Sequence, residues 1–150
     1  MTILRKPIIN ALFITLFSCI YCMLFTIPAN HMELYRILNK PETLKSPFWN
    51  YCTNFIIEGN TRYISMIFVV LTIFIVIFSV IKREKFDEFQ FKGLIHSLTY
   101  CGLLSIFLLP ISLLLIISDT NYAIETIYVI ATIDWLTILI ADLFHLIKKE

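Results

Sequence analysis

The residues that could carry chemistry are concentrated in the last apolar stretch of the chain, residues 123–147. It contains three acidic residues, Glu125, Asp134 and Asp142, together with His145. Asp134 lies near the middle of the stretch, where a charge inside a membrane is costly, so its side chain is expected to face other helices and to be partnered or protonated. The candidate partners are Thr72, Ser105, Thr137 and His96.

Two functions remain open for Asp134: a relay for protons or ions, and a bonding point for a partner helix. The alternative is a structural hydrogen bond that fixes helix packing. A transporter normally has more polar groups inside the membrane and broken helices in paired halves. The sequence therefore favours structural or partner bonding.

The other polar residues of 123–147 lie closer to its ends. Glu125 is expected to reach water. Asp142 and His145 are three residues apart, on one helix face, and are expected to pair with each other or with Lys148. A metal site built from Asp142, His145 and His96 is an alternative that the spacing leaves open. We predict no metal and no cofactor.

The cysteines offer a second kind of chemistry. Cys19 and Cys22 form a C-x-x-C motif, which occurs in redox and metal sites. Here the motif lies inside an apolar run, where cysteine usually packs as a small hydrophobic residue. A quinone-linked thiol oxidoreductase, resembling the DsbB and vitamin K epoxide reductase families, is the enzymatic alternative, but only Cys52 lies between apolar runs. Soluble-enzyme motifs such as the P-loop or G-x-S-x-G do not occur, and we predict that the protein is not an enzyme.

Composition indicates a membrane protein. Hydrophobic residues make up 59% of the 150 residues, and the mean hydropathy is +0.83. The stretch 63–81 runs nineteen residues without a charge, a Pro or a Gly, which is long enough for a helix to cross a bilayer. A net charge of +1 gives no reason to expect nucleic-acid binding. We predict an all-α, polytopic membrane domain without internal repeats or heptad arrays, with transmembrane helices at 8–27, 63–81, 94–117 and 123–147.

The segments around these spans carry further candidate residues. The first span is expected to stay uncleaved, because no signal-peptidase site follows it. An outer loop is predicted at 30–62, with Pro41, Pro47 and Gly59 as helix breakers and a short interfacial helix at 32–38. A tight turn is predicted at 118–121 between the last two spans. Pro110 is expected to kink the third span, and His96 to lie near its inner end. The loop aromatics are expected to anchor the loop to headgroups or to bind a partner: Phe48, Trp49, Tyr51 and Phe55.

The distribution of Lys and Arg predicts the orientation. The N-terminal tail carries two, the connector 82–92 four and the C-terminal end two, which is eight on one side. The loop 30–62 carries four and the turn 118–121 none. Because cytoplasmic segments are enriched in basic residues, both termini are expected in the cytoplasm.

This layout resembles the immunity proteins of pore-forming colicins, in particular those of the colicin A, B and N group. The likeness lies in four spans, one long outer loop, a basic inner connector and a Lys-rich end. Local likenesses are Leu34–Lys40 and Pro47 to Tyr51 in the outer loop, Asp119-Thr120 in the second outer turn, and Lys148-Lys149. Asn60-Thr61-Arg62 departs from the small and polar pair that precedes the second span in that group.

The resemblance implies a function in the bacterial inner membrane. Such proteins protect the producing cell by meeting the hydrophobic hairpin of the toxin within the bilayer. It implies a partner-binding role for Asp134, Pro110, His96 and the aromatics Phe48, Trp49 and Tyr51. Two other small membrane-binding functions remain as alternatives: an exclusion factor against conjugation or superinfection, and an accessory subunit of a larger complex.

Overall fold

In the computed structural model, the chain is described at residues 7–26, 47–81, 88–118 and 122–147, and these residues are almost entirely helical. No strand occurs in these four ranges, so the predicted all-α class is confirmed. The helices, in chain order, are α1 (Pro7–Thr26), α3 (Pro47–Ile57), α4 (Thr61–Ile81), α5 (Glu88–Ser118) and α6 (Ala123–Ile147).

The four predicted transmembrane helices are all present. α1, α4, α5 and α6 are each long and apolar enough to cross a bilayer, which makes the chain a multi-pass membrane protein. α5 begins at Glu88, six residues before the predicted start at 94. Residues 88–92 contain no proline or glycine that would end a helix there. The predicted interfacial helix 32–38 lies outside the described residues, as do residues 119–121 of the predicted turn.

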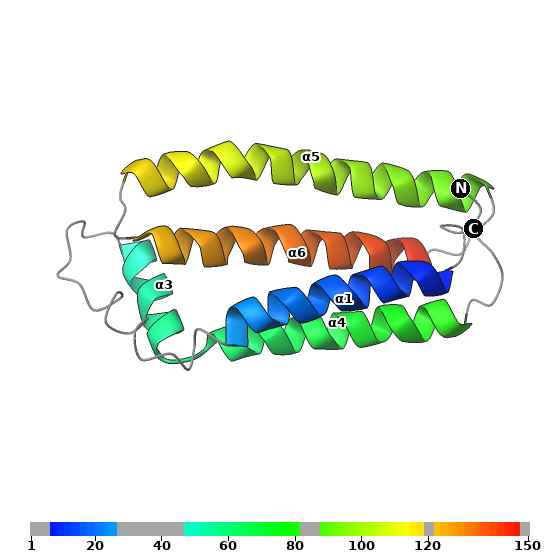
Figure 1. Ribbon diagram of the computed structural model, residues 1–150, viewed down its shortest axis with the longest axis horizontal. Helices are drawn as coiled ribbons and strands as arrows, with labels where there is room; N and C mark the ends of the chain where they lie inside the picture. The colour runs from blue at the N-terminus through cyan, green and yellow to red at the C-terminus, as the bar shows by residue number, and fades with distance from the viewer. Residues whose placement is uncertain (1–6, 27–46, 82–87, 119–121, 148–150) are drawn as a thin grey trace.

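α6 is the central helix of the bundle (Figure 1). It packs against α4 and α5 along its length, and α1 packs closely along α4 and also touches α6. α5 packs mainly against α6. α1 begins and α6 ends at the same end of the bundle, and α3 lies across the opposite end, which we call the α3 end.

The buried face of α4 follows a strict helical spacing. Its buried residues recur every three or four positions, and four of the six carry hydroxyls: Thr61, Ser65, Phe68, Thr72, Ile75 and Ser79. This spacing brings one stripe of a helix against its neighbours, and small hydroxyl residues let two backbones approach closely. The six buried positions differ from the rest of α4 in polarity and size, because the lipid-facing positions are as apolar as the core.

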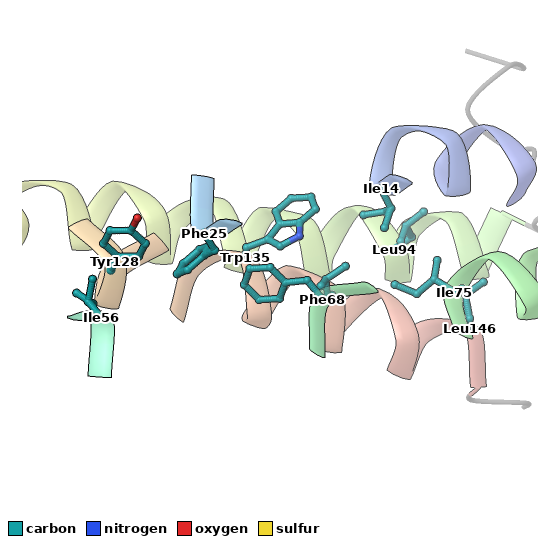
Figure 2. Packing of buried hydrophobic residues seen from close by; sticks show 10 residues of the cluster. Ile14, Phe25, Ile56, Phe68, Ile75, Leu94, Tyr128, Trp135 and Leu146 are labelled. Atoms are coloured by element: carbon teal, nitrogen blue, oxygen red, sulfur yellow. The ribbon is translucent and has the colours of Figure 1, made fainter. Parts of the chain in front are cut away.

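Aromatic side chains fill the interior between α1, α4 and α6 (Figure 2). Phe25 and Phe68 have no exposed surface, and their rings pack edge to face with centroids 5.6 Å apart. Phe25 meets the Tyr128 ring in the same way at 5.0 Å. The Tyr128 hydroxyl donates to the Leu24 carbonyl oxygen over 3.1 Å, so its one polar group is satisfied.

α3 corrects the prediction that 30–62 is a loop with its only helix at 32–38. The sequence analysis treated Pro47 as a breaker, but at the first position of a helix proline leaves no hydrogen bond unmade. Gly59 ends α3 with φ +73. Its N–H donates to the Ile56 carbonyl over 3.0 Å and the Asn60 N–H donates to the Phe55 carbonyl over 3.1 Å. These two bonds form a Schellman cap, which turns the chain directly into α4.

Candidate intramembrane binding site

The structure places Asp134 midway along α6, at a point where three helices meet. Ser105 of α5 donates its hydroxyl to Oδ1 of Asp134. Tyr21 of α1 donates its hydroxyl to Oδ2 over 3.4 Å. Of the four predicted partners, Ser105 is confirmed. Thr72 and Thr137 donate hydrogen bonds to other residues, and the described residues show no hydrogen bond between His96 and Asp134. Tyr21 was not predicted.

Tyr21 is held in place by its ring. It stacks on Trp135 with centroids 4.7 Å apart and planes 9° apart. The Trp135 indole N–H donates to the Ser18 hydroxyl oxygen over 3.2 Å, and Thr72 donates to the same oxygen over 2.7 Å. The chain Thr72–Ser18–Trp135 thus fixes the plane on which Tyr21 rests. As a result, the Tyr21 hydroxyl is positioned beside Asp134 by α1, α4 and α6 together.

Asp134 lines an open groove on the surface of α6. One hollow, of about 600 Å³, lies between α1 and α6, and a second, of about 330 Å³, lies between α5 and α6. Tyr21 and Ala131 line both hollows, so the two adjoin at these residues, and we call them together the α6 groove; Asp134 lines the second hollow. Its walls are α1 and α5, and its floor is α6. The remaining lining is apolar except for Ser105, Ser112 and Asp134.

The groove combines lipid-like walls with one strong acceptor. An ionised carboxylate has about four lone-pair positions, and two donors leave acceptor capacity on both oxygens. Inside a membrane, such an acceptor is a natural bonding point for a donor on another helix. The geometry therefore suits the binding of a transmembrane helix that carries a hydroxyl, amide or amine at the same depth.

Comparison of the chain with protein-family models, with curated proteins and with solved structures gives no match in any of the three. The arguments about function therefore depend on the geometry of the described residues and on the layout of the sequence.

The other predicted partner-binding residues are not gathered at the α6 groove. Pro110 and His96 are both exposed on α5 and do not line the groove. Phe48 and Tyr51 are exposed on α3, whereas Trp49 is half-buried and stacks on Tyr122 at 5.8 Å. The structure thus separates two surfaces that the sequence analysis grouped together, one at mid-membrane depth and one at the α3 end.

Asp142 forms a second buried polar contact, nearer the end of the bundle opposite α3. Only 1% of its surface is exposed, and Asn10 of α1 donates to its Oδ1 over 2.7 Å. Asn10 is a partner that the sequence analysis did not expect, and it reaches Asp142 because α1 packs against this turn of α6; Lys148 lies outside the described residues. The His145 ring lies beside Gly93 of α5. Within the described ranges, no cluster of three His, Cys, Asp or Glu residues could hold a metal ion.

The expectation that Glu125 reaches water is wrong. It is 1% exposed, because α3 lies across the start of α6 and covers it. Thr53 of α3 donates its hydroxyl to Oε1 of Glu125 over 2.7 Å. Cys52, the neighbour of Thr53, has a raised pKa, first because it is partly buried and second because the Glu125 carboxylate opposes the thiolate charge.

All four cysteines are free thiols. Cys19 is exposed on α1, and the Cys22 thiol donates weakly to the Ser65 carbonyl over 3.7 Å. Cys101 is buried and approaches the Thr137 carbonyl at 3.9 Å. The contacts of Cys22 and Cys101 are helix-to-helix packing contacts, of the kind that the sequence analysis expected for Cys22.

Proposed function

We propose that the protein binds a transmembrane helix of a partner protein in the α6 groove, and that this partner is the hydrophobic hairpin of a pore-forming bacteriocin. Binding there blocks channel opening and makes the chain an immunity protein of the bacterial inner membrane, with both termini in the cytoplasm. The observation that carries the proposal is the Asp134 carboxylate, which lies at mid-membrane depth in an open groove between α1 and α5.

The packing of the bundle supports a site on this side. Lipid chains are as apolar as leucine, so apolar walls alone do not favour a protein helix over lipid. Asp134 adds the polar contact that lipid chains do not offer. The exposed side of α5 adds apolar area next to the groove, including Phe107, which is 72% exposed.

The choice of a bacteriocin as partner is supported by the layout of the chain. The number of spans, the long segment before the second span and the distribution of Lys and Arg resemble colicin immunity proteins. On this proposal, specificity between toxins comes from the position of the donor on the toxin helix, because a helix without a donor at that depth leaves Asp134 without a new partner.

Protection of live cells tests the proposal. The chain is expressed in a sensitive bacterium, pore-forming colicins are added one at a time, and potassium efflux is followed. We expect protection against one toxin and not against its relatives. If the chain protects against none of the colicins in a broad panel, this result would contradict the bacteriocin assignment and favour an exclusion factor or an accessory subunit.

Asp134→Asn then tests the site. The amide keeps the size of the side chain but replaces one carboxyl oxygen by an NH₂ group, so we expect the protective capacity to fall roughly tenfold, equivalent to about 1.4 kcal/mol. Thr99→Ala is the matched control, because the Thr99 hydroxyl bonds only the Ile95 carbonyl of its own helix and lies outside the groove. Protection that survives Asp134→Asn unchanged would place the toxin contact elsewhere.

A further inference from the structure

The hollow between α5 and α6, which is the second part of the α6 groove, has its only acid at one end. Asp134 and Ser105 lie at the end farther from α3. From there the lining follows α6 to Ile127, about two turns or roughly 10 Å closer to the α3 end. Asp134 is only partly buried and lines the hollow, so a group that enters the hollow can reach its carboxylate.

The hydroxyl groups that line this hollow already donate their hydrogens within the chain. Ser105 donates to Oδ1 of Asp134, and Tyr21 donates to Oδ2. Ser112, near the other end of the hollow, donates to the Leu109 carbonyl oxygen over 2.6 Å. These side chains can therefore offer a partner only the lone pairs of their oxygens. A partner that binds here has to supply hydrogen-bond donors.

The charge at the hollow is also one-sided. The four segments that span the membrane contain no Lys or Arg: 7–26, 63–81, 93–118 and 122–147. Two histidines of these segments lie farther from α3, with His96 roughly 13 Å along α5 from Ser105 and His145 roughly 16 Å along α6 from Asp134. The spans thus place no basic group at the depth of Asp134, and a cation on a partner would balance its charge.

We propose that the α6 groove accepts a lysine side chain of the partner helix, with the ammonium group at Asp134 and the side-chain stem along the hollow. The inference rests on the proposed function, because it takes the partner to be a transmembrane helix and specifies its donor. An ammonium has three N–H donors and no acceptor, which matches a lining that offers only acceptors. The four-carbon stem of lysine suits the apolar part of the lining, which includes Leu108, Leu109, Ile127 and Ile130.

The pair of Asp134 and lysine selects between partner helices. A lysine near the middle of a bilayer is costly as long as its ammonium has no partner. In the groove the ammonium meets a carboxylate in surroundings that screen charge weakly, so the contact offsets part of this cost. A glutamine at the same place offers N–H donors without a charge, and a leucine offers neither. The expected order of affinity is therefore lysine, then glutamine, then leucine.

Binding of designed helices tests the proposal without a toxin. The full chain, labelled with an acceptor dye at its C-terminus, is reconstituted in vesicles of phosphatidylcholine, a lipid without net charge. Leucine-rich single-span peptides with a donor dye carry lysine, glutamine or leucine at the central position, and energy transfer is measured against peptide density. We expect the lysine peptide to bind roughly tenfold more tightly than the leucine peptide, equivalent to about 1.4 kcal/mol, with the glutamine peptide between them.

Two variants test whether the preference comes from Asp134. Asp134→Asn removes the carboxylate and is expected to remove the preference for lysine. Glu58→Gln is the matched control, because it makes the same carboxylate-to-amide change at an exposed residue that does not line the α6 groove. The preference should persist in that variant. The comparison of the three peptides on the wild-type chain needs no substitution, so it does not depend on how Asp134→Asn folds.

Equal binding of the lysine and glutamine peptides to the wild-type chain would overturn the proposal, and so would equal binding of the lysine and leucine peptides. A preference that survives in Asp134→Asn or disappears in Glu58→Gln would also overturn it. None of these results contradicts the immunity function, which the protection of live cells tests. Conversely, a chain that protects against no colicin can still prefer the lysine peptide, so the two failures are distinguishable.

Discussion

α4 and α5 are the two most apolar spans of the chain, with hydropathies of 3.1 and 2.5, yet they are packed very differently. In the most apolar 18-residue segment of each helix, 28% of α4 is buried inside the bundle, against 6% of α5. α4 contacts α1 and α6 through its stripe of hydroxyl and aromatic residues, whereas α5 packs chiefly against α6. Hydropathy thus measures suitability for a membrane, while the placement of small and hydroxyl residues decides which helix becomes the core.

The difference assigns roles to the two sides of the bundle. α1, α4 and α6 form a packed unit that holds Tyr21 and Trp135 in fixed positions. α5 contributes one wall of the α6 groove and one donor to Asp134, and most of its surface stays available to lipid or to a partner. Substitutions on the two spans should therefore have unequal effects on stability.

Truncation of one phenylalanine in each span gives the largest expected contrast. Phe68→Ala in α4 removes a ring with no exposed surface and should reduce the free energy of unfolding by about 1–3 kcal/mol. Phe107→Ala in α5 removes a ring that is 72% exposed and should change it by less than about 0.5 kcal/mol. Unfolding in mixed micelles by added SDS measures both. Equal losses would show that α5 is as much a part of the packed core as α4.

Two glycines provide the next contrast. Gly59 has φ +73 at the end of α3, so Gly59→Ala should destabilise the turn into α4 by about 1–2 kcal/mol, although nothing would touch the added methyl group. Gly102 lies within α5 with open space around it, so Gly102→Ala should be neutral or stabilising by up to about 1 kcal/mol. The same unfolding measurement tests both substitutions, and a loss of stability in Gly102→Ala would contradict the open space around this position.

The bond between Ser105 and Asp134 tests how firmly α5 is attached. A double-mutant cycle with Ser105→Ala and Asp134→Asn should give a coupling of about 0.6 kcal/mol, the average for hydrogen bonds between transmembrane helices. A coupling well above about 1.7 kcal/mol would contradict the view of α5 as a loosely attached wall. It would make Asp134 mainly a structural residue.

The smallest expected effect is on Cys52 at the α3 end. Burial first, and then the Glu125 carboxylate, raise the pKa of its thiol, so less thiolate is present at pH 8.5 than for free cysteine. Glu125→Gln removes the second cause and should lower this pKa, which increases the rate of alkylation by iodoacetamide at that pH. The pH profile of the rate measures the change. An unchanged profile would place the carboxylate too far from the thiol to act on it.

The sequence predicts the membrane-spanning elements well and their contacts poorly. Length and apolarity locate all four spans, since the bilayer sets both. α3 was missed because Pro47 was read as a breaker, and the burial of Glu125 was missed with it, since α3 packs over that residue.

The candidate site was predicted in part. The cost of a charge in the bilayer singled out Asp134 and required it to face the bundle, which the structure bears out. Tyr21 was overlooked because nothing in the first span shows which residue of another span it faces. Its ring is placed by Trp135, which lies 114 residues later in the chain. Tyr21 continues the three- and four-residue spacing of the buried residues of α1, which are Pro7, Ala11, Ile14, Ser18 and Phe25.

The length of α5 makes the groove sensitive to the thickness of the bilayer. Its apolar part, Phe91–Ile117, has 27 residues and is roughly 40 Å long, whereas the hydrocarbon core is about 30 Å thick. The excess is relieved by tilting, and α5 can tilt most easily because it is attached chiefly to one neighbour. Long-chain lipids allow α5 to stand more upright, and short-chain lipids favour a larger tilt. We therefore expect the width of the α6 groove to depend on the acyl-chain length of the surrounding membrane.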